Sequence, residues 1–270
     1  MIKQPNIEVR SFTLTENSLS MSIRKNVLLY FPKSCLGIDR NASNVTCGNA
    51  EQVLQFDLSK IEEIAKTTKE IVRSFKRNDV RIRKDISSKY GKRRSERVKQ
   101  ILHHVSKTIV EDAKTVQAAI VFEDIRGLRN LYRKGNFQGR EFRGRMNSVP
   151  WYEIKRQIEY KAAWECVPII QLTKGETRGT SKKCPVCGER LQEDIRRERK
   201  RQLWCSECKR WLDRDLVAVM NISYKGWLRF GQSEGGASEA MVKEHGGSEL
   251  PSILKVDASK LSRRLLQPRT

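Results

Sequence analysis

The sequence lacks any long apolar run. None of its 270 residues lies in an uninterrupted apolar stretch of about 18, the length that a membrane-spanning helix requires. The N-terminus, MIKQPNIEVRSF, is polar and strand-like and lacks the apolar centre of a signal peptide. These absences argue against an integral membrane protein, a membrane partner and a secreted protein. We therefore expect a soluble cytoplasmic protein, long enough for one large domain and one small module.

Acidic residues are scarce beside basic ones. The chain holds 54 Lys and Arg against 32 Asp and Glu, a formal charge of +22, with a pI near 9.9. Self-repulsion on that scale disfavours a compact state unless a polyanion such as a nucleic-acid backbone offsets it. Solubility through charge alone is the plainer explanation, but this pI is typical of nucleic-acid-binding proteins. The basic residues gather in segments 76–97, 126–145 and 196–201.

The seven cysteines cannot all pair as disulfides, because their number is odd. Cys35, Cys47 and Cys166 are scattered through apolar or strand-like stretches, and the other four form two C-x-x-C pairs. In a reducing compartment this arrangement indicates a metal site and three free thiols instead of a disulfide framework.

The two C-x-x-C pairs have the spacing of a zinc ribbon. Four thiolates surround Zn²⁺ tetrahedrally and leave no open position, so this zinc is expected to be structural. A segment as short as 180–212 cannot build its own core, so the metal would supply its folding energy. The alternatives are a chance pair of motifs or a redox dithiol, although a redox dithiol needs only one pair. The predicted zinc ligands are Cys184, Cys187, Cys205 and Cys208.

A basic segment, Arg196–Arg201, lies between the two cysteine pairs, and Trp204 and Trp211 flank the second pair. Basic and aromatic side chains together can grip and stack on a nucleic acid. A solvated hairpin with packed tryptophans explains the same residues, and both interpretations stay open.

Apolar periodicity divides the chain into short strands and longer helices. Three strand candidates follow one another closely from Cys35, as antiparallel neighbours do. Later strands alternate with helices, of which the helix from Val98 to Val116 has the clearest apolar face. This order is that of an RNase H-like α/β fold with a mixed sheet. The predicted strands are 35–40, 44–48, 53–58, 118–124 and 167–172, and the predicted helices are 59–76, 98–116, 151–162 and 213–230.

The remaining segments complete the division of the chain. Residues 7–31 alternate apolar and polar side chains around a turn near Glu16–Asn17, so we assign 1–32 to a short β segment. Residues 126–147 indicate a flexible basic loop or a helix with a loose start, and 231–270 a flexible tail. The main domain then comprises 33–179 and the helix 213–230, interrupted by the zinc ribbon 180–212.

Three acidic residues hold marked positions in this plan. Asp39 lies in the first strand, Glu123 ends the apolar strand AIVFE, and Asp215 starts the last helix. Taken singly, each could be a solvated strand end or a helix cap. If the two strands are neighbours, however, the carboxylates converge and need a hard cation such as Mg²⁺ among them. Two such ions about 3.5–4 Å apart would activate water and stabilise the leaving oxygen of a phosphodiester.

Several motifs also occur in a specific order. They are GID at 37–39, Glu-Asp at 123–124, RGTSKKCPVCG at 178–188, and CSEC followed by DRDLVAVMNI at 213–222. With EYKAAWECVPIIQL at 159–172 and HHVSKTIV at 103–110, they resemble the TnpB (OrfB) family over roughly residues 30 to 235. These are transposon-associated, RNA-guided DNA endonucleases with a RuvC-like domain, similar to the compact type V CRISPR effectors.

The resemblance implies roles for the residues singled out above. It implies that Asp39, Glu123 and Asp215 form the catalytic Mg²⁺-binding triad and that the four cysteines bind zinc. It further implies Mg²⁺-dependent hydrolysis of DNA in one RuvC site, directed by a guide RNA. The expected partners are therefore DNA and a guide RNA, and the expected location is the nucleoid of a prokaryotic cytoplasm.

The sequence departs from the family pattern in three places. Val217 replaces an Asn of the last motif, although Asn221 is retained, and Asn41 stands where Gly is common. Only about thirty residues precede the first motif, so 1–32 resembles the end of a longer N-terminal lobe. The short N-terminus indicates a truncated copy, a gene remnant or a derivative with a changed job, and we expect the chain to bind nucleic acid but to cut weakly or without guidance. The alternatives are a derivative that binds without cutting, and a junction-type resolvase, against which the position of the ribbon argues.

Overall fold

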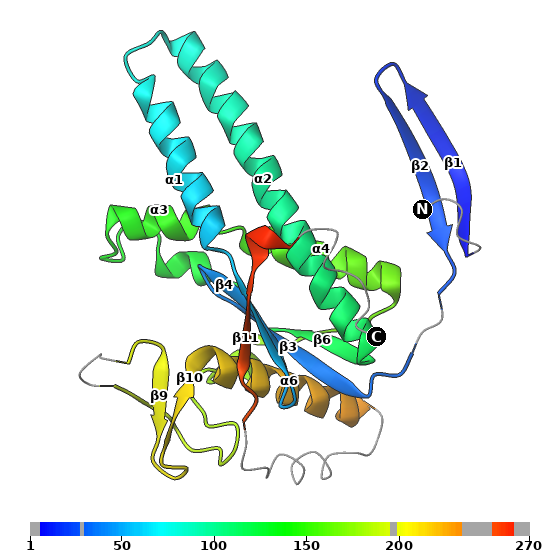
Figure 1. The fold of residues 1–270 in the computed structure, drawn as a ribbon, viewed down its shortest axis with the longest axis vertical. Helices are drawn as coiled ribbons and strands as arrows, with labels where there is room; N and C mark the ends of the chain where they lie inside the picture. Colours follow the sequence, from blue (N-terminus) through cyan, green and yellow to red (C-terminus); the bar gives the residue numbers. More distant parts are fainter. Residues whose placement is uncertain (1–5, 28–29, 195–198, 234–249, 262–270) are drawn as a thin grey trace.

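The computed structural model describes residues 6–27, 30–194, 199–233 and 250–261. Its centre is a six-stranded mixed sheet in the order β11-β5-β4-β3-β6-β7 (Figure 1). Strands β3, β4 and β5 are antiparallel, whereas β6 and β7 run parallel to β3. Short turns join the antiparallel strands and helices join the parallel ones, as chain reversal requires. The strands are β3 (Ser34–Arg40), β4 (Asn44–Gly48), β5 (Val53–Asp57), β6 (Ala118–Phe122), β7 (Ile169–Gln171) and β11 (Ile253–Asp257).

This mixed sheet confirms the predicted fold class. Apart from β11, the strands follow the predicted sequence of three antiparallel strands and two parallel additions. The predicted helices appear as α1 (Ser59–Ser74), α2 (Val80–Thr115), α4 (Trp151–Glu165) and α6 (Arg214–Ser233).

Helices cover both faces of the sheet. Leu36, Ile38 and Phe122 pack with buried residues of α2 and α4 on one face. Cys35 and Val121 pack with Ile222 of α6 on the other. Because side chains alternate along a strand, residues 35, 37 and 39 of β3 face α6.

Helix α6 lies directly on the backbone of β3. A Cβ atom at Gly37 would be 2.3 Å from the carbonyl oxygen of Val219, closer than atoms can approach. The hydroxyl of Ser223 also donates to the Cys35 carbonyl at 2.6 Å. Gly37 therefore sets the spacing between this strand and this helix.

The basic segment 76–97 is mostly helical, which the sequence analysis did not predict. Helix α2 begins at Val80, and Asp79 caps it by accepting from the backbone N–H of Arg81 at 2.7 Å. Residues 80–97 contain few apolar side chains, so apolar periodicity could not indicate that they are helical. With α1 they form a projecting pair of helices (Figure 1), which we call the helical arm, residues 59–97.

Two further segments differ from or refine the prediction. Residues 126–147 contain a short 3₁₀ helix, Leu128–Leu131, and most of α3 (Arg140–Ser148). The predicted flexible tail, 231–270, is wrong for the part that forms β11 and the 3₁₀ turn Ala258–Lys260. Strand β11 pairs in parallel with β5, a partner far away in the sequence, so local composition could not reveal it. Residues 234–249 and 262–270 of that tail lie outside the described residues.

The N-terminal segment forms the predicted hairpin. Strands β1 (Ile7–Thr15) and β2 (Ser18–Lys25) form a separate two-stranded sheet around the expected turn (Figure 1). At its base, Lys25 pairs with Glu165 of α4 at 2.9 Å.

Within the described residues, no helix is both long enough and apolar enough to cross a membrane.

Candidate active site and metal centre

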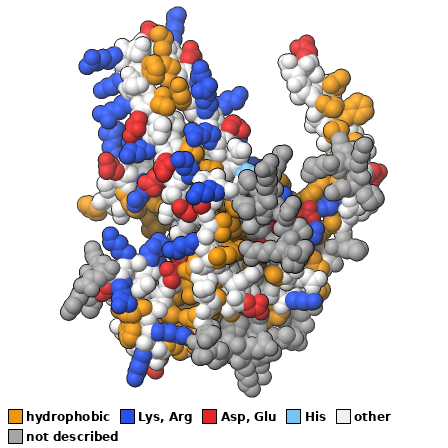
Figure 2. All heavy atoms as spheres, in the orientation of Figure 1, with side chains coloured by type: hydrophobic (Ala, Val, Ile, Leu, Met, Phe, Trp, Pro, Cys, Tyr) orange, Lys and Arg blue, Asp and Glu red, His pale blue; other side chains and the backbone are white. Residues whose placement is uncertain are grey.

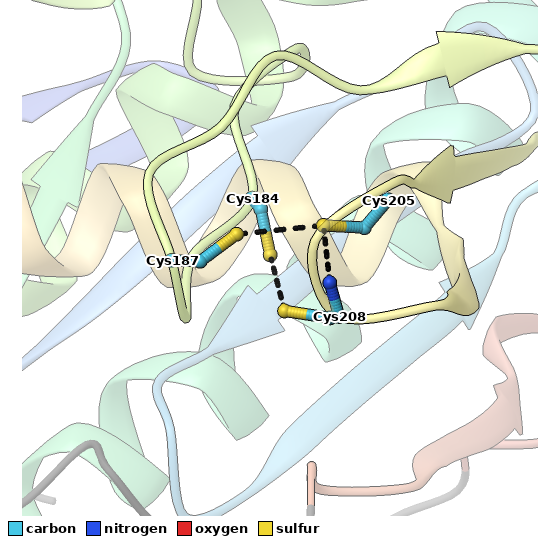
Figure 3. Close-up of side chains that lie close together, drawn as sticks. All are labelled: Cys184, Cys187, Cys205 and Cys208. Carbon is cyan, nitrogen blue, oxygen red and sulfur yellow. Dashed lines mark hydrogen bonds between the residues drawn. The ribbon is translucent and has the colours of Figure 1, made fainter.

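The four cysteines of the ribbon lie together (Figure 3). Their sulfur atoms are all within 4.8 Å of one another, with 3.8 Å between Cys184 and Cys208 and 3.4 Å between Cys187 and Cys205. A tetrahedron with Zn–S bonds of about 2.3 Å has sulfur atoms about 3.8 Å apart. The cluster thus fits a Zn²⁺ ion with four protein ligands and no open position.

Local turns build this cluster. Gly188 adopts φ +79° and its N–H donates to the Cys184 carbonyl at 2.9 Å, which closes the first C-x-x-C turn. Three short strands carry the rest: β8 (Gln192–Glu193), β9 (Gln202–Cys205) and β10 (Arg210–Asp213). A small core of Leu191, Leu203 and Leu212 packs against Val217 of α6. The ribbon is therefore seated on the first turns of that helix.

The basic segment of the ribbon is only partly described, because residues 195–198 lie outside the described part of the chain. The rings of Trp204 and Trp211 pack against each other with centroids 5.3 Å apart, and the Arg199 guanidinium lies 5.0 Å from the Trp211 ring. Both tryptophans thus have partners within the ribbon.

The structure brings the three predicted acids to one edge of the sheet. Asp39 lies near the end of β3, Glu123 directly follows β6, and Asp215 is in the first turn of α6. Strands β3 and β6 pair in parallel with Ile38 opposite Phe122, so Asp39 and Glu123 occupy the next position on the face that α6 covers. The amide of Asn41 donates to Asp39 at 2.7 Å and to Asp215 at 3.2 Å.

Burial disfavours the charged forms of Asp39 and Glu123. Burial, with the nearby charges of Glu123 and Asp215, raises the pKa of Asp39 to about 7. Burial likewise raises the pKa of Glu123, against the opposing charge of Arg40. Protonation or a bound cation would therefore stabilise these buried acids. Carboxylate oxygens are the donors that suit Mg²⁺.

Asp215 is almost fully buried, at 2% exposure, and several donors surround it. Gln55 of β5 donates to its Oδ2 atom at 2.9 Å, and Asn44 of β4 reaches the same atom at 3.5 Å. Arg201, at the entrance to β9 with φ +66°, forms an ion pair with its Oδ1 atom. The ribbon thus contributes a cation to the group of acids.

Sequence reasoning missed Gln55 and Arg201. Gln55 is a polar residue between two apolar neighbours in β5. Because side chains alternate between the two faces of a strand, its side chain is on the face that α6 covers, and this signal could have identified it. Arg201 ends a run of basic residues, and nothing in that run distinguishes it from its neighbours.

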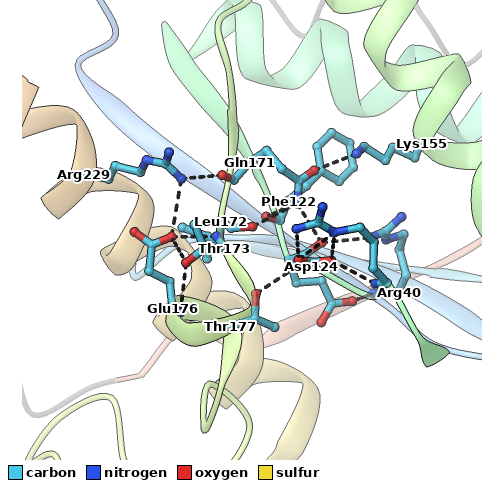
Figure 4. Close-up of polar contacts among 12 residues, drawn as sticks. Arg40, Phe122, Asp124, Lys155, Gln171, Leu172, Thr173, Glu176, Thr177 and Arg229 are labelled. Atoms are coloured by element: carbon cyan, nitrogen blue, oxygen red, sulfur yellow. Dashed lines mark hydrogen bonds and ion pairs between the residues drawn. The ribbon is translucent and has the colours of Figure 1, made fainter. Parts of the chain in front are cut away.

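Arg40 and Gln171 hold the end of β6 (Figure 4). The buried Arg40 guanidinium donates to the Glu123 carbonyl at 3.0 Å and lies 5.4 Å from the Phe122 ring. Gln171 donates to the same carbonyl at 3.1 Å, and the N–H of Asp124 donates to the Thr177 hydroxyl at 2.9 Å. These contacts fix the backbone that carries the Glu123 carboxylate.

Comparison with known families places this site in context. The model of the Cas12f1-like TNB domain matches residues 151–222, a segment that includes all four ribbon cysteines and Asp215. TnpB-like protein MJ0751 of Methanocaldococcus jannaschii is 26% identical over 233 residues, covering 83% of this chain and 80% of that protein. TnpB-like protein MJ1635 of the same organism is 24% identical over 243 residues. The resemblance to the TnpB family that the motifs predict is confirmed.

Solved structures show the same fold. The chain is similar to one in the cryo-EM structure of the Cas12f1–sgRNA–target DNA complex, with a TM-score of 0.51 and 18% sequence identity. That match covers 80% of this chain but 55% of the Cas12f1 chain, and the match to MJ1635 covers 53% of that protein. The chain thus spans about half the length of these two relatives, whereas MJ0751 is of similar length.

Proposed function

We propose that this chain, a relative of the TnpB-like proteins, is a metal-dependent nuclease that cleaves DNA phosphodiesters and is directed by a bound guide RNA. The observation that carries the proposal is the convergence of Asp39, Glu123 and Asp215 at one sheet edge. Magnesium bound there would polarise a phosphodiester and supply an activated water.

Each acid has a distinct support within the chain. Asp39 and Glu123 are held by adjacent, hydrogen-bonded strands, so their separation is fixed by the sheet. Asp215 is oriented by Gln55 and by the seating of α6 on Gly37. Among the described residues, Arg201 forms an ion pair with Asp215, and we assign it the role of contacting the phosphate that is cut.

The zinc site has a structural role and takes no part in the reaction. A cation with four cysteine ligands has no position left for water or substrate. We therefore assign Cys184, Cys187, Cys205 and Cys208 a structural Zn²⁺, which keeps the ribbon and Arg201 against the start of α6.

The helical arm supports a nucleic-acid partner. Figure 2 shows Lys and Arg side chains along the arm, and 76–97 contains ten of them against three acids. Residues 80–97 extend about 27 Å at the helical rise of 1.5 Å per residue, most of one turn of a duplex. A surface of this kind holds a duplex by its phosphates and does not read its sequence. Sequence specificity would then come from base pairing between the target and a guide RNA.

The second candidate is a derivative that binds nucleic acid without cutting it. The ion pair between Arg201 and Asp215 favours this candidate, because it uses a carboxylate oxygen that a metal ion would need.

One experiment separates the two candidates. The purified chain, expressed with and without RNA transcribed next to its gene, is incubated with plasmid DNA and Mg²⁺. Cutting of a matched target but not of a mismatched one, lost in Asp39→Ala, supports the proposal. Asp257→Asn is the matched control, because Asp257 also ends a strand of the sheet but its carboxylate caps the turn Ala258–Lys260. Binding without Mg²⁺-dependent cutting would instead support the second candidate.

A further inference from the structure

Asn41 occupies the turn between β3 and β4. Its backbone N–H donates to the Asn44 carbonyl at 2.9 Å, which closes the turn. Its side-chain amide also donates to the Oδ1 atom of Asn44 at 3.1 Å. The side chain is thus held in one orientation by the turn that it belongs to.

The same amide nitrogen links two of the three acids. It donates to Asp39 Oδ2 at 2.7 Å and to Asp215 Oδ1 at 3.2 Å. Asp39 belongs to a strand and Asp215 to a helix, and Asp215 lies 174 residues after Asn41, so no local turn fixes their separation. The nitrogen of Asn41 is therefore a bridge between two distant parts of the chain.

Electrostatics explains why a neutral bridge is useful here. Two partly or fully buried carboxylates repel each other, and a charged bridge would itself be costly to bury. An amide offers hydrogen-bond donors with partial positive charge and a small desolvation cost. Gln55 and Asn44 donate to the other oxygen of Asp215, so they orient that carboxylate without spanning the gap to Asp39.

We propose that Asn41 is a positioning residue that holds Asp39 and Asp215 together before any divalent ion binds. This inference rests on the proposed function, in which the two acids bind metal. A glycine at position 41 would have no side chain to form the bridge. Two of the three acids of this chain are accordingly held together in advance of the ion.

A thermodynamic cycle tests the bridge without metal or substrate. Thermal unfolding is measured for Asn41→Gly, Asp39→Asn and the double variant, with no divalent ion added. We expect Asn41→Gly to lower the melting temperature of the wild type, and most of that loss to disappear when Asp39 is already neutral. If Asn41 serves only its turn, the loss is equal in both backgrounds, and the proposal is overturned.

Metal binding provides the second test. Titration with Mn²⁺ in the absence of nucleic acid, followed by electron paramagnetic resonance, should show binding roughly tenfold weaker in Asn41→Gly, the usual effect of losing a group that orients a ligand. Asn49→Gly is the matched control, since Asn49 closes the β4–β5 turn by accepting from the N–H groups of Glu51 and Gln52. It should lower stability and leave Mn²⁺ affinity unchanged.

The outcomes separate this inference from the proposed function. Unchanged Mn²⁺ affinity in Asn41→Gly, with binding lost in Asp39→Ala, overturns the positioning role and leaves the metal site standing. Unchanged affinity in Asp39→Ala contradicts the metal site itself, and with it both proposals.

Discussion

The two candidate metal sites of this protein are built in opposite ways. The four cysteines come from one segment of 25 residues and are positioned by local turns. The three carboxylates come from positions 39, 123 and 215 and share one edge of the sheet only because β3, β6 and α6 pack together. The first site is closed by its ligands, whereas the second has fewer protein ligands and crowded charges. A structural ion suits the first arrangement and a reactive one suits the second.

The two sites are nevertheless physically connected. Helix α6 follows directly from β10 of the ribbon, and Asp215 lies in its first turn. Asn221, farther along the helix, donates to the carbonyls of Thr180 and Lys183 at 2.7 and 2.8 Å. A change in the ribbon should therefore reach Asp215 through the start of α6.

The largest effect is expected from loss of zinc. Binding of a structural zinc contributes on the order of 10 kcal/mol to modules of this size, so Cys184→Ala should unfold 180–212. Metal analysis should find one Zn²⁺ per chain in the wild type and none in the variant. Limited proteolysis should then cut within the ribbon while the main sheet stays protected. Cys166→Ala is the control, because Cys166 lies outside the cluster.

An absence of zinc in the purified wild type would contradict the ribbon assignment. Equal protease resistance in Cys184→Ala and the wild type would show that the ribbon does not depend on its cysteines.

A smaller effect, about 4 kcal/mol, is expected from neutralising one acid of the triad. The pKa of Asp39 is raised from 3.8 to about 7 by folding, so its contribution to stability is fully present below pH 4 and is lost as the pH rises to 7. Asp39→Asn should remove this loss. Urea unfolding without added divalent ions should find the variant more stable than the wild type at pH 8, with little difference at pH 4.

Added Mg²⁺ should stabilise the wild type more than Asp39→Asn, because the proposed Mg²⁺ site includes the Asp39 carboxylate. If the two proteins lose stability in parallel between pH 4 and 8, then Asp39 is not crowded by its neighbours in solution.

The smallest effect concerns the helical arm. Removing one cation that neutralises a phosphate should lower the slope of log K against log salt concentration by about 0.9, so Lys89→Ala, Arg93→Ala and Arg97→Ala together should lower it by about 2 to 3. Duplex binding is measured by fluorescence anisotropy over a series of salt concentrations. Lys255→Ala, an exposed lysine on the edge strand β11, is the control. An unchanged slope in the triple variant would assign nucleic-acid binding to other surfaces.

The same contrast explains what could be predicted from sequence. Cysteine spacing is a local pattern, and the ribbon followed from it directly. Asp39 and Glu123 were recognisable because each ends a buried run, and the order of the strands then implied that they meet. That implication needed the fold, which the alternation of strands and helices supplied.

Other features depend on contacts that no local pattern encodes. Arg201 reaches Asp215 only because the ribbon folds back onto α6. The first half of α2 is helical although it buries little, since its N-terminal cap and helix-forming side chains support it without an apolar stripe. Strand β11 is short and is recognisable only beside its partner β5.

That last pairing has a consequence for how the chain is made. Strand β11 joins β5 although about two hundred residues separate them, so this edge of β5 has no strand beside it until residues 253–257 have left the ribosome. Contacts of such long sequence separation form slowly, because a large loop must close first. An open strand edge also invites pairing with other chains during that interval. This protein should thus stay vulnerable to aggregation until β11 is paired, and β11 is synthesised after all three acids.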